Sequence, residues 1–195
     1  MFKKFKAGEL ELNVVTWTSI TASCVQNGKC MEPLELFRDM QANGVEPNAV
    51  TIPSLIPASG NISALTHGKE IHCFSLRKGI CDDVYVGSAL IDMYANFGRI
   101  WLSQNCFDEM SFCNLVSWNS IMSGYAMHGK AKETIEMFHM MLQSCQKPYS
   151  ITFTSVLSAC TQNGLTGITL IACRKNPMLN LKWNITLAWL HFSVV

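Results

Sequence analysis

The chain has little charge and no long hydrophobic run. Charged residues make up only 15% of its 195 residues, and 15 basic against 14 acidic side chains give a net charge of +1. A strongly basic nucleic-acid binder would carry a larger positive charge. The overall charge therefore neither supports nor excludes a nucleic-acid partner, and it leaves room for a locally basic groove.

Membrane and export signals are also missing. The apolar run Trp183–Val195 is shorter than the roughly 20 apolar residues that a membrane-spanning helix needs. The basic N-terminus, residues 1–8, is followed by no apolar segment long enough for a secretory signal, and it is not a persuasive transit peptide. We expect a chain without a membrane partner.

Motifs for catalysis or metal binding are absent from the sequence. None of the nine cysteines forms a Cys-x-x-Cys pair, and the five histidines show no metal-ligand spacing with acids or thiols. Neither a phosphate-binding Gly-Lys-Ser/Thr loop nor a nucleophile elbow occurs. We expect no enzyme, no cofactor and no metal, and we expect reduced, buried cysteines that behave as small hydrophobes in a reducing compartment.

The sequence does contain an internal repeat. The segment Val14–Ile20 returns as Leu115–Ile121, 101 residues later, and the similarity continues through Gly28 with Gly129, Phe37 with Phe138, and Met40 with Met141. An interval of 101 fits two units of 35 residues and one of 31. A period in this range is typical of stacked helical pairs, so the repeat predicts an all-α solenoid.

The repeat divides the chain into predicted units. The divisions are 2–13 (tail of a truncated unit), 14–48 (unit one), 49–83 (unit two, long), 84–114 (unit three, short), 115–149 (unit four), 150–167 (partial unit five) and 168–195 (irregular tail).

Each unit is predicted to form two helices. In the first, apolar residues recur three or four apart and form one face, as in unit four. A glycine at the fifteenth place ends that helix in units one, three, four and five, whereas unit two has Ser63 there. The second helix has a Phe–Met pair three residues apart, which we expect in the core. The positions behind this pattern are Trp118, Ile121, Met122 and Tyr125; Gly28, Gly98, Gly129 and Gly164; and Phe37 with Met40, Phe107 with Met110, and Phe138 with Met141.

These features resemble the pentatricopeptide repeat family. The first-helix sequences 16–20, 89–94 and 115–121 and the second-helix ends 44–48 and 107–110 are close to its typical motifs, over about residues 2–167. The mixed unit lengths resemble the plant subclass in which ordinary, long and short repeats alternate. The resemblance implies a right-handed superhelix that binds single-stranded RNA in mitochondria or chloroplasts, as an adaptor in RNA editing, splicing or maturation. One base per helical repeat is read by two or three side chains.

The resemblance also implies the site residues. In this family the fifth and last residues of a unit read a base, and the second residue sandwiches it. The implied base readers are Thr18 with Asn48 (adenine), Pro53 with Asp83 (little or no selection), Ser88 with Asn114 (adenine), Asn119 with Tyr149 (pyrimidine, although Tyr149 departs from the usual residues) and Thr154 (purine). The implied sandwiching residues are Val15, Val50, Tyr85, Val116 and Ile151. The expected footprint, 5′ to 3′, is A, any base, A, pyrimidine, purine.

Other interpretations stay open. Thr, Ser and Asn near a helix start more often cap the helix than contact a base, and the second-place residues fit a core equally well. The chain also fits a protein-binding scaffold similar to tetratricopeptide arrays, or a truncated, vestigial fragment with little RNA binding. Some members of the subclass carry a cytidine-deaminase-like domain, but its His-x-Glu and Cys-x-x-Cys motifs are absent here. Editing or processing factors would then act in trans, and DNA is not an expected partner.

Overall fold

A computed structural model describes residues 13–28, 32–56 and 62–162. Predictions for Gly164, the truncated unit before Asn13 and the tail after residue 162 lie outside these residues. Within them, all regular structure is helical. The helices are α2 (Val14–Gln26), α3 (Glu32–Ala42), α4 (Thr51–Leu55), α5 (Ile62–Lys78), α6 (Val84–Asn96), α7 (Ile100–Asp108), α8 (Leu115–Met127), α9 (Ala131–Gln143) and α10 (Ser150–Gln162).

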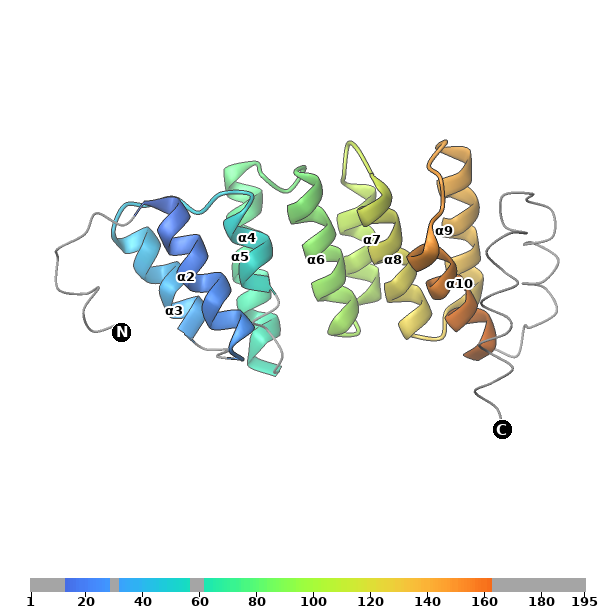
Figure 1. The fold of residues 1–195 in the computed structure, drawn as a ribbon, viewed down its shortest axis with the longest axis horizontal. Helices are drawn as coiled ribbons and strands as arrows, with labels where there is room; N and C mark the ends of the chain where they lie inside the picture. Colours follow the sequence, from blue (N-terminus) through green and yellow to red (C-terminus); the bar gives the residue numbers. More distant parts are fainter. Residues whose placement is uncertain (1–12, 29–31, 57–61, 163–195) are drawn as a thin grey trace.

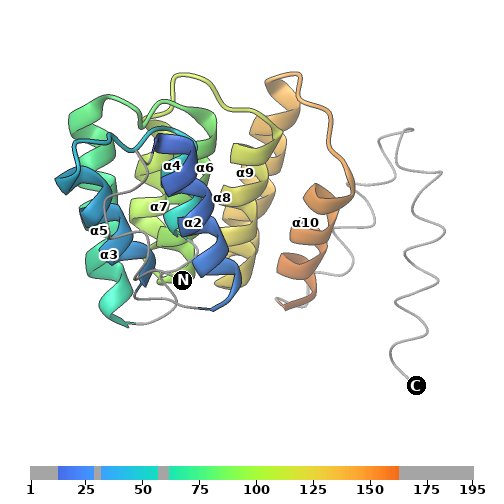
Figure 2. The same cartoon turned by 60° about the vertical axis from the view of Figure 1, so that its left-hand side comes forward.

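The helices form two layers. The first helices of successive units, α2, α4, α6, α8 and α10, each pack against the next and make one continuous layer. The second helices α3, α7 and α9 pack on the first helices of their own hairpins, and α5 packs on α6. Figure 1 shows the hairpins side by side in chain order, and Figure 2 shows the same row after a turn. The predicted all-α solenoid of helical repeats is confirmed.

The core lies where the periodicity predicts it. The three Phe–Met pairs of the second helices are all buried, with Met40 and Met141 almost fully enclosed. In α8 the predicted apolar face is buried as well, since Ile121 and Met122 have no exposed surface. Phe107 and Trp118 meet edge to face across the α7–α8 hairpin, with ring centroids 4.7 Å apart. Aromatic pairs of this geometry add to the stabilisation that burial of their area provides.

Glycine ends the first helices as predicted. Gly28, Gly98 and Gly129 have φ values of 71°, 69° and 66°, in the left-handed region that favours glycine. In unit two the place falls on Ser63, inside the first turn of α5, and residues 57–61 before it are outside the described part.

The second helices end in the same conformation at the thirty-first place of a unit. Gly44 and Gly79 have φ values of 72° and 66°, and the equivalent place in unit four is Cys145, with φ 59°. A non-glycine residue in this region has its Cβ close to the following carbonyl oxygen, which costs roughly 1–2 kcal/mol. Cys145 is therefore a strained position in a repeat that elsewhere uses glycine.

The layer of first helices is close-packed between α6 and α8. A Cβ added to Gly124 would lie 2.8 Å from the Cβ of Ala95. Two hydrogen bonds tie the hairpins to α6 nearby: Ser103 Oγ donates to the Ile91 carbonyl at 2.9 Å, and His128 Nε2 lies 2.7 Å from the Ala95 carbonyl. The absence of a side chain at Gly124 permits this approach.

The cysteines only partly follow the prediction. Cys24, Cys106 and Cys160 are buried, but Cys73 and Cys145 are exposed, so the expectation of uniformly buried cysteines was wrong. Burial raises the pKa of Cys81 to about 11 and that of Cys106 to about 12, with the Glu109 carboxylate adding to both shifts. These two thiols are protonated at neutral pH, and thiols are poor nucleophiles and metal ligands.

In the part of the chain that the structure describes, no helix is long and apolar enough to span a bilayer. Among the same residues, no group of three or more His, Cys, Asp or Glu side chains is placed to hold a metal ion.

Candidate nucleic-acid interface

The second residue of every unit presents an apolar side chain to solvent. All five residues lie at or just before the start of a first helix, in successive members of one layer. Their exposed fractions are 67% for Val15, 68% for Val50, 67% for Tyr85, 43% for Val116 and 53% for Ile151. They are therefore not core residues, although their type fits a core. Their exposure forms a regular row of apolar contacts, one per repeat.

The last residue of a unit caps the first helix of the next. The Oδ1 of Asn48 accepts hydrogen bonds from the Val50 and Thr51 amides, both at 3.0 Å. The Oδ1 of Asp83 accepts from the Tyr85 and Val86 amides at 2.9 and 3.2 Å. The alternative that these residues are helix caps is thus correct for Asp83, and Asn48 binds the backbone amides just before and at the start of α4 in a similar way.

The same capping occurs at Asn114, whose Oδ1 accepts from the Val116 amide at 2.8 Å and the Ser117 amide at 3.2 Å. Unit four differs because Tyr149 has no capping group. Its backbone amide donates instead to Thr152 Oγ1 at 3.3 Å, and its ring is 37% exposed.

Capping and base contact are compatible, because each cap uses a single side-chain oxygen. The two backbone donors fix the orientation of the Asn48 and Asn114 amides, so that Nδ2 points away from the helix end. An amide nitrogen carries two donor hydrogens. Asp83 keeps its second carboxylate oxygen, an acceptor. The helix end therefore presents a donor at Asn48 and Asn114 and an acceptor at Asp83.

The two base readers of unit one meet through a third residue. Thr18 Oγ1 donates to the Val14 carbonyl at 2.7 Å and lies 2.8 Å from Thr51 Oγ1. Thr51 Oγ1 in turn donates to Asn48 Oδ1 at 3.0 Å. One hydroxyl at the third place of unit two thus connects the fifth and last residues of unit one.

Unit three repeats part of this arrangement. Ser88 is buried, and its Oγ lies 3.1 Å from the Oγ of Ser117, the third residue of unit four. The backbone amide of Ser117 donates to Asn114 Oδ1. The implied readers Ser88 and Asn114 are therefore brought together around one residue of the next unit.

The remaining readers are placed differently. Pro53 lies in α4, and the third residue of the following unit is Val86, which has no hydroxyl to link it to Asp83. Thr154 is exposed, and its Oγ1 donates to the Ser150 carbonyl at 3.0 Å. Its partner place lies outside the described residues.

Asn119 holds a buried polar atom without a partner. The residue is only 6% exposed, its Nδ2 donates to the Leu115 carbonyl at 2.5 Å, and its Oδ1 has no hydrogen bond. A buried acceptor without a donor costs about 1–3 kcal/mol. Oδ1 is enclosed by the protein, so this acceptor stays unsatisfied in the folded chain.

The first-helix layer is nearly uncharged. The described first helices contain no Lys or Arg, and their one charged side chain is Asp92. Desolvation raises the pKa of Asp92, and a hydrogen bond with Ser120 partly opposes the shift. A basic stripe along these helices, which would favour RNA over a protein partner, is therefore not present in the described residues.

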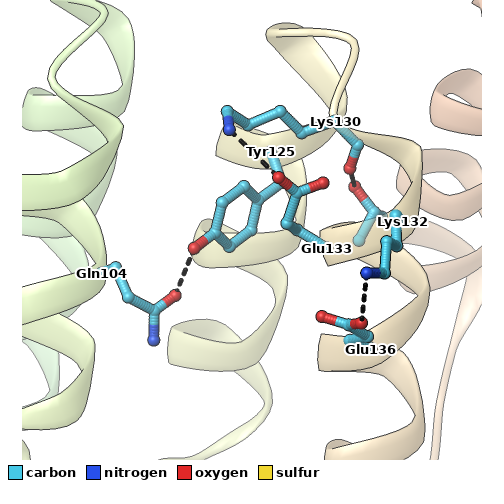
Figure 3. A network of polar contacts seen from close by, with 7 residues as sticks. Gln104, Tyr125, Lys130, Lys132, Glu133 and Glu136 are labelled. Atoms are coloured by element: carbon cyan, nitrogen blue, oxygen red, sulfur yellow. Dashed lines mark hydrogen bonds and ion pairs between the residues drawn. The ribbon is translucent and has the colours of Figure 1, made fainter.

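Basic side chains lie mainly on the second helices, where several of them pair with acids. Figure 3 shows one such region, in which Tyr125 on α8 donates to Gln104 on α7 at 2.6 Å. The pKa of Glu133 is lowered by a hydrogen bond with its own backbone and by the Lys130 ammonium. The ion pairs are Arg38–Glu70 (2.9 Å), Lys78–Glu46 (2.5 Å), Lys130–Glu133 (3.0 Å) and Lys132–Glu136 (3.8 Å).

The sequence prediction missed the third-place residues. The third-place residue of the following unit is Thr51 after Thr18, Ser117 after Ser88 and Thr152 after Asn119. After Pro53 it is Val86. A hydroxyl thus occurs at the third place where the preceding fifth residue is polar. The residue types of that pattern are present in the sequence, but the contact between neighbouring units is seen only in the structure.

The stacked hairpins define the chain as an α-solenoid of helical repeats. A model of the PPR repeat family matches residues 12–59 and 113–162, and a model of the PPR repeat matches residues 88–115. The chain belongs to the pentatricopeptide repeat family, and the resemblance noted from its motifs is confirmed.

Two relatives from Arabidopsis thaliana illustrate the relationship. Pentatricopeptide repeat-containing protein At1g20230 is 59% identical over 166 residues, which cover 85% of this chain and 22% of that protein. The chloroplastic pentatricopeptide repeat-containing protein CRR2 is 41% identical over 155 residues, covering 78% and 24%. The chain therefore spans less than a quarter of the length of each.

Among solved structures, the chain is similar to the pentatricopeptide repeat protein PPR10 in complex with an 18-nt psaJ RNA element. The TM-score is 0.75 at 17% sequence identity, over 89% of this chain and 26% of that one. At this identity the likeness establishes the shared fold.

Proposed function

We propose that this chain binds single-stranded RNA along its layer of first helices, with one base per unit. The fifth and last residues of a unit contact the edge of the base, and second-place side chains of neighbouring units hold its faces. The footprint, 5′ to 3′, is A, any base, A, pyrimidine, purine. PPR10, which shares the fold, is known in complex with an RNA element.

The observation that carries the proposal is the exposure of all five second-place side chains. Water contact with Val15, Val50 and Tyr85 costs free energy that a stacked base would recover, because bases have apolar faces. Such a row at a one-per-unit spacing matches the one-base-per-repeat mode of recognition. The residues beside the row that bind the helix starts, Asn48, Asp83 and Asn114, supply the hydrogen-bonding groups.

Hydrogen-bond chemistry supports adenine at units one and three. The Watson–Crick edge of adenine has a donor, N6–H, and an acceptor, N1. Thr18 or Ser88 can accept from the donor, while Nδ2 of Asn48 or Asn114 donates to the acceptor. Cytosine offers the same pattern on a smaller ring, and a short Thr or Ser leaves the room that a purine fills.

Unit four follows the same logic with a longer fifth residue. Asn119 has a longer side chain than Ser or Thr, so it leaves less room for a base. This favours the smaller ring of a pyrimidine, and the partly exposed Tyr149 offers an aromatic face.

The role we propose is that of a non-catalytic adaptor in RNA editing, splicing or maturation within a mitochondrion or chloroplast. Relatives named as chloroplastic support an organellar location. Any catalytic step would come from editing or processing factors supplied in trans.

A binding titration at fixed salt tests the proposal. The chain is titrated with a short RNA centred on A-N-A-Y and with the same RNA carrying cytosine at both adenines. We expect tighter binding to the first probe, and we expect the preference to disappear in Thr18→Asn combined with Ser88→Asn, because the longer side chain removes the room for a purine.

Equal binding of the two probes would leave only nonspecific attraction and would overturn the proposal. No binding by a folded chain would favour the peptide-binding scaffold or the vestigial fragment. A direct titration with an extended peptide distinguishes those two, because only a scaffold binds it.

A further inference from the structure

We infer that the hydroxyl at the third place of a unit is a positioning residue for base selection by the preceding unit. Thr51 serves unit one and Ser117 serves unit three. The inference rests on the proposed function and adds a residue to the fifth, last and second places. A base is then selected by residues of two successive units.

The hydrogen bonds around Thr51 use the hydroxyl hydrogens of both Thr18 and Thr51. A hydroxyl has one donor hydrogen and two lone pairs. The Thr18 hydrogen goes to the Val14 carbonyl at 2.7 Å, and the Thr51 hydrogen goes to Asn48 Oδ1 at 3.0 Å or to Thr18 Oγ1 at 2.8 Å. Neither hydrogen is left for a base, so Thr18 meets the base as an acceptor.

The Thr51 hydroxyl also adds to the orientation that the two backbone amides give the last residue. The Val50 and Thr51 amides donate to Asn48 Oδ1 at 3.0 Å, and the Thr51 hydroxyl, also at 3.0 Å, donates to it when its hydrogen is not given to Thr18. Turning the amide over would place Nδ2, itself a donor, against both backbone amides and would require the Thr51 hydroxyl to accept instead of donate. Asn48 is therefore fixed with its donor outward.

An acceptor at Thr18 and a donor at Asn48 complement adenine and oppose guanine. Guanine presents an acceptor at O6 and a donor at N1–H, the reverse of adenine. The third-place hydroxyl thus acts on the choice between adenine and guanine. The choice between adenine and cytosine depends on ring size and is independent of the third-place hydroxyl.

Ser117 occupies the equivalent place around unit three. Its Oγ lies 3.1 Å from Ser88 Oγ, and its amide donates to Asn114 Oδ1 at 3.2 Å. In unit two, where Pro53 has no hydroxyl to orient, the third place of the following unit is Val86, which is fully buried. The hydroxyl contacts the preceding fifth residue in units one and three, whereas Thr152 contacts the Tyr149 amide and not Asn119.

Single-base probes test the inference. Four RNAs are compared: the A-N-A-Y probe, the probe with guanine at the first adenine, the probe with guanine at the third base, and the probe with cytosine at both. For Thr51→Val we expect the preference for adenine over guanine to fall about three- to tenfold at the first base. The third base should be unaffected.

Ser117→Ala should give the reciprocal result, a loss of selection at the third base and none at the first. Thr51→Ser restores a hydroxyl and should restore selection, which a change in packing alone would not explain. Thermal unfolding of each variant confirms its fold, and Ser117→Ala carries the test if Thr51→Val does not fold.

The outcomes separate the inference from the proposed function. The inference alone is overturned if the chain prefers adenine over cytosine and if its preference for adenine over guanine is unchanged in both Thr51→Val and Ser117→Ala. Equal binding of adenine and guanine by the unaltered chain does the same. Equal binding of adenine and cytosine by the unaltered chain overturns the proposed function and the inference with it.

Discussion

At the scale of single residues, Cys145 departs from its own repeat. It has φ 59° where the first two units have Gly44 and Gly79 in the same conformation. Glycine removes the Cβ strain of roughly 1–2 kcal/mol but costs about 0.5–1 kcal/mol of chain entropy. We expect Cys145→Gly to raise the free energy of unfolding by about 0.5–1 kcal/mol, measured by urea denaturation.

The matched control is Gly44→Ala, which introduces at unit one the strain that Cys145 has at unit four. It should lower the free energy of unfolding by about 1 kcal/mol. A destabilising Cys145→Gly would mean that the thiol makes a compensating contact.

His72 is a second residue that departs from the repeat, since the equivalent places in the other complete units hold Phe37, Phe107 and Phe138. Its Nδ1 lies 2.8 Å from the Tyr94 hydroxyl, and burial lowers its pKa below 6.5 despite the opposing charge of Glu109. The unfolded chain therefore binds more protons than the folded chain just below pH 6.5.

Stability should accordingly decrease as the pH falls below 6.5 toward the lower pKa of the folded state, and its histidine-dependent part is fully present above 6.5. In His72→Phe this pH dependence should be weaker. The check is the midpoint of urea unfolding between about pH 5 and 7.5, at 0.1 M salt. An unchanged pH profile in His72→Phe would show that another group is responsible.

At the scale of helices, the approach of α6 and α8 depends on Gly124. A Cβ at this position would lie 2.8 Å from the Cβ of Ala95, and neither backbone can move without disturbing the layer. We expect Gly124→Val to lower the free energy of unfolding by about 1–3 kcal/mol. The measurement is equilibrium unfolding followed by circular dichroism.

Gly87→Val is the comparison for that variant. The added Cβ would meet Met110 Sδ at 2.8 Å, and a thioether can move aside. Gly87→Val should therefore lower the free energy of unfolding clearly less than Gly124→Val. Equal losses for the two variants would contradict the steric explanation and would point to a general penalty for valine in these helices.

The helices themselves were predictable from the sequence, because the periodicity of Phe37, Met40 and their equivalents directly reports which face is buried. The exposed row at the second place was not, since the type of Val15 fits a core and a surface equally well. The role of Thr51 was also hidden, because it depends on how two successive units pack. Cys73 is exposed because of its place on a helix. The general tendency of cysteine to be buried does not take that place into account.

At the scale of the whole molecule, the near absence of charge along the first helices predicts the salt dependence of binding. For single strands the logarithm of the binding constant falls by about 0.7 per decade of salt for each phosphate neutralised. We expect a slope shallower than about −1.4, which corresponds to two phosphates. Titrations at several salt concentrations provide the slope.

A slope steeper than about −3 would require four or more neutralised phosphates. Such a result would place the RNA on the basic second helices rather than on the row of second-place side chains. The probe with cytosine for adenine is the control, since it should show the same slope.

The central claim is that the last residue of a unit both caps a helix and selects a base. Asn114→Asp tests it, because Asp83 shows that aspartate makes the same cap with two backbone amides. The exchange replaces an outward donor by an acceptor and leaves the fold intact. Binding is measured for four A-N-N-Y probes that differ only in the third base.

The account predicts that the unaltered chain prefers adenine at the third base and that Asn114→Asp removes this preference, because aspartate offers no donor to adenine N1, with the first base still selected as adenine. An unchanged preference for adenine in a folded Asn114→Asp chain would contradict the account and leave Asn114 as a helix cap alone.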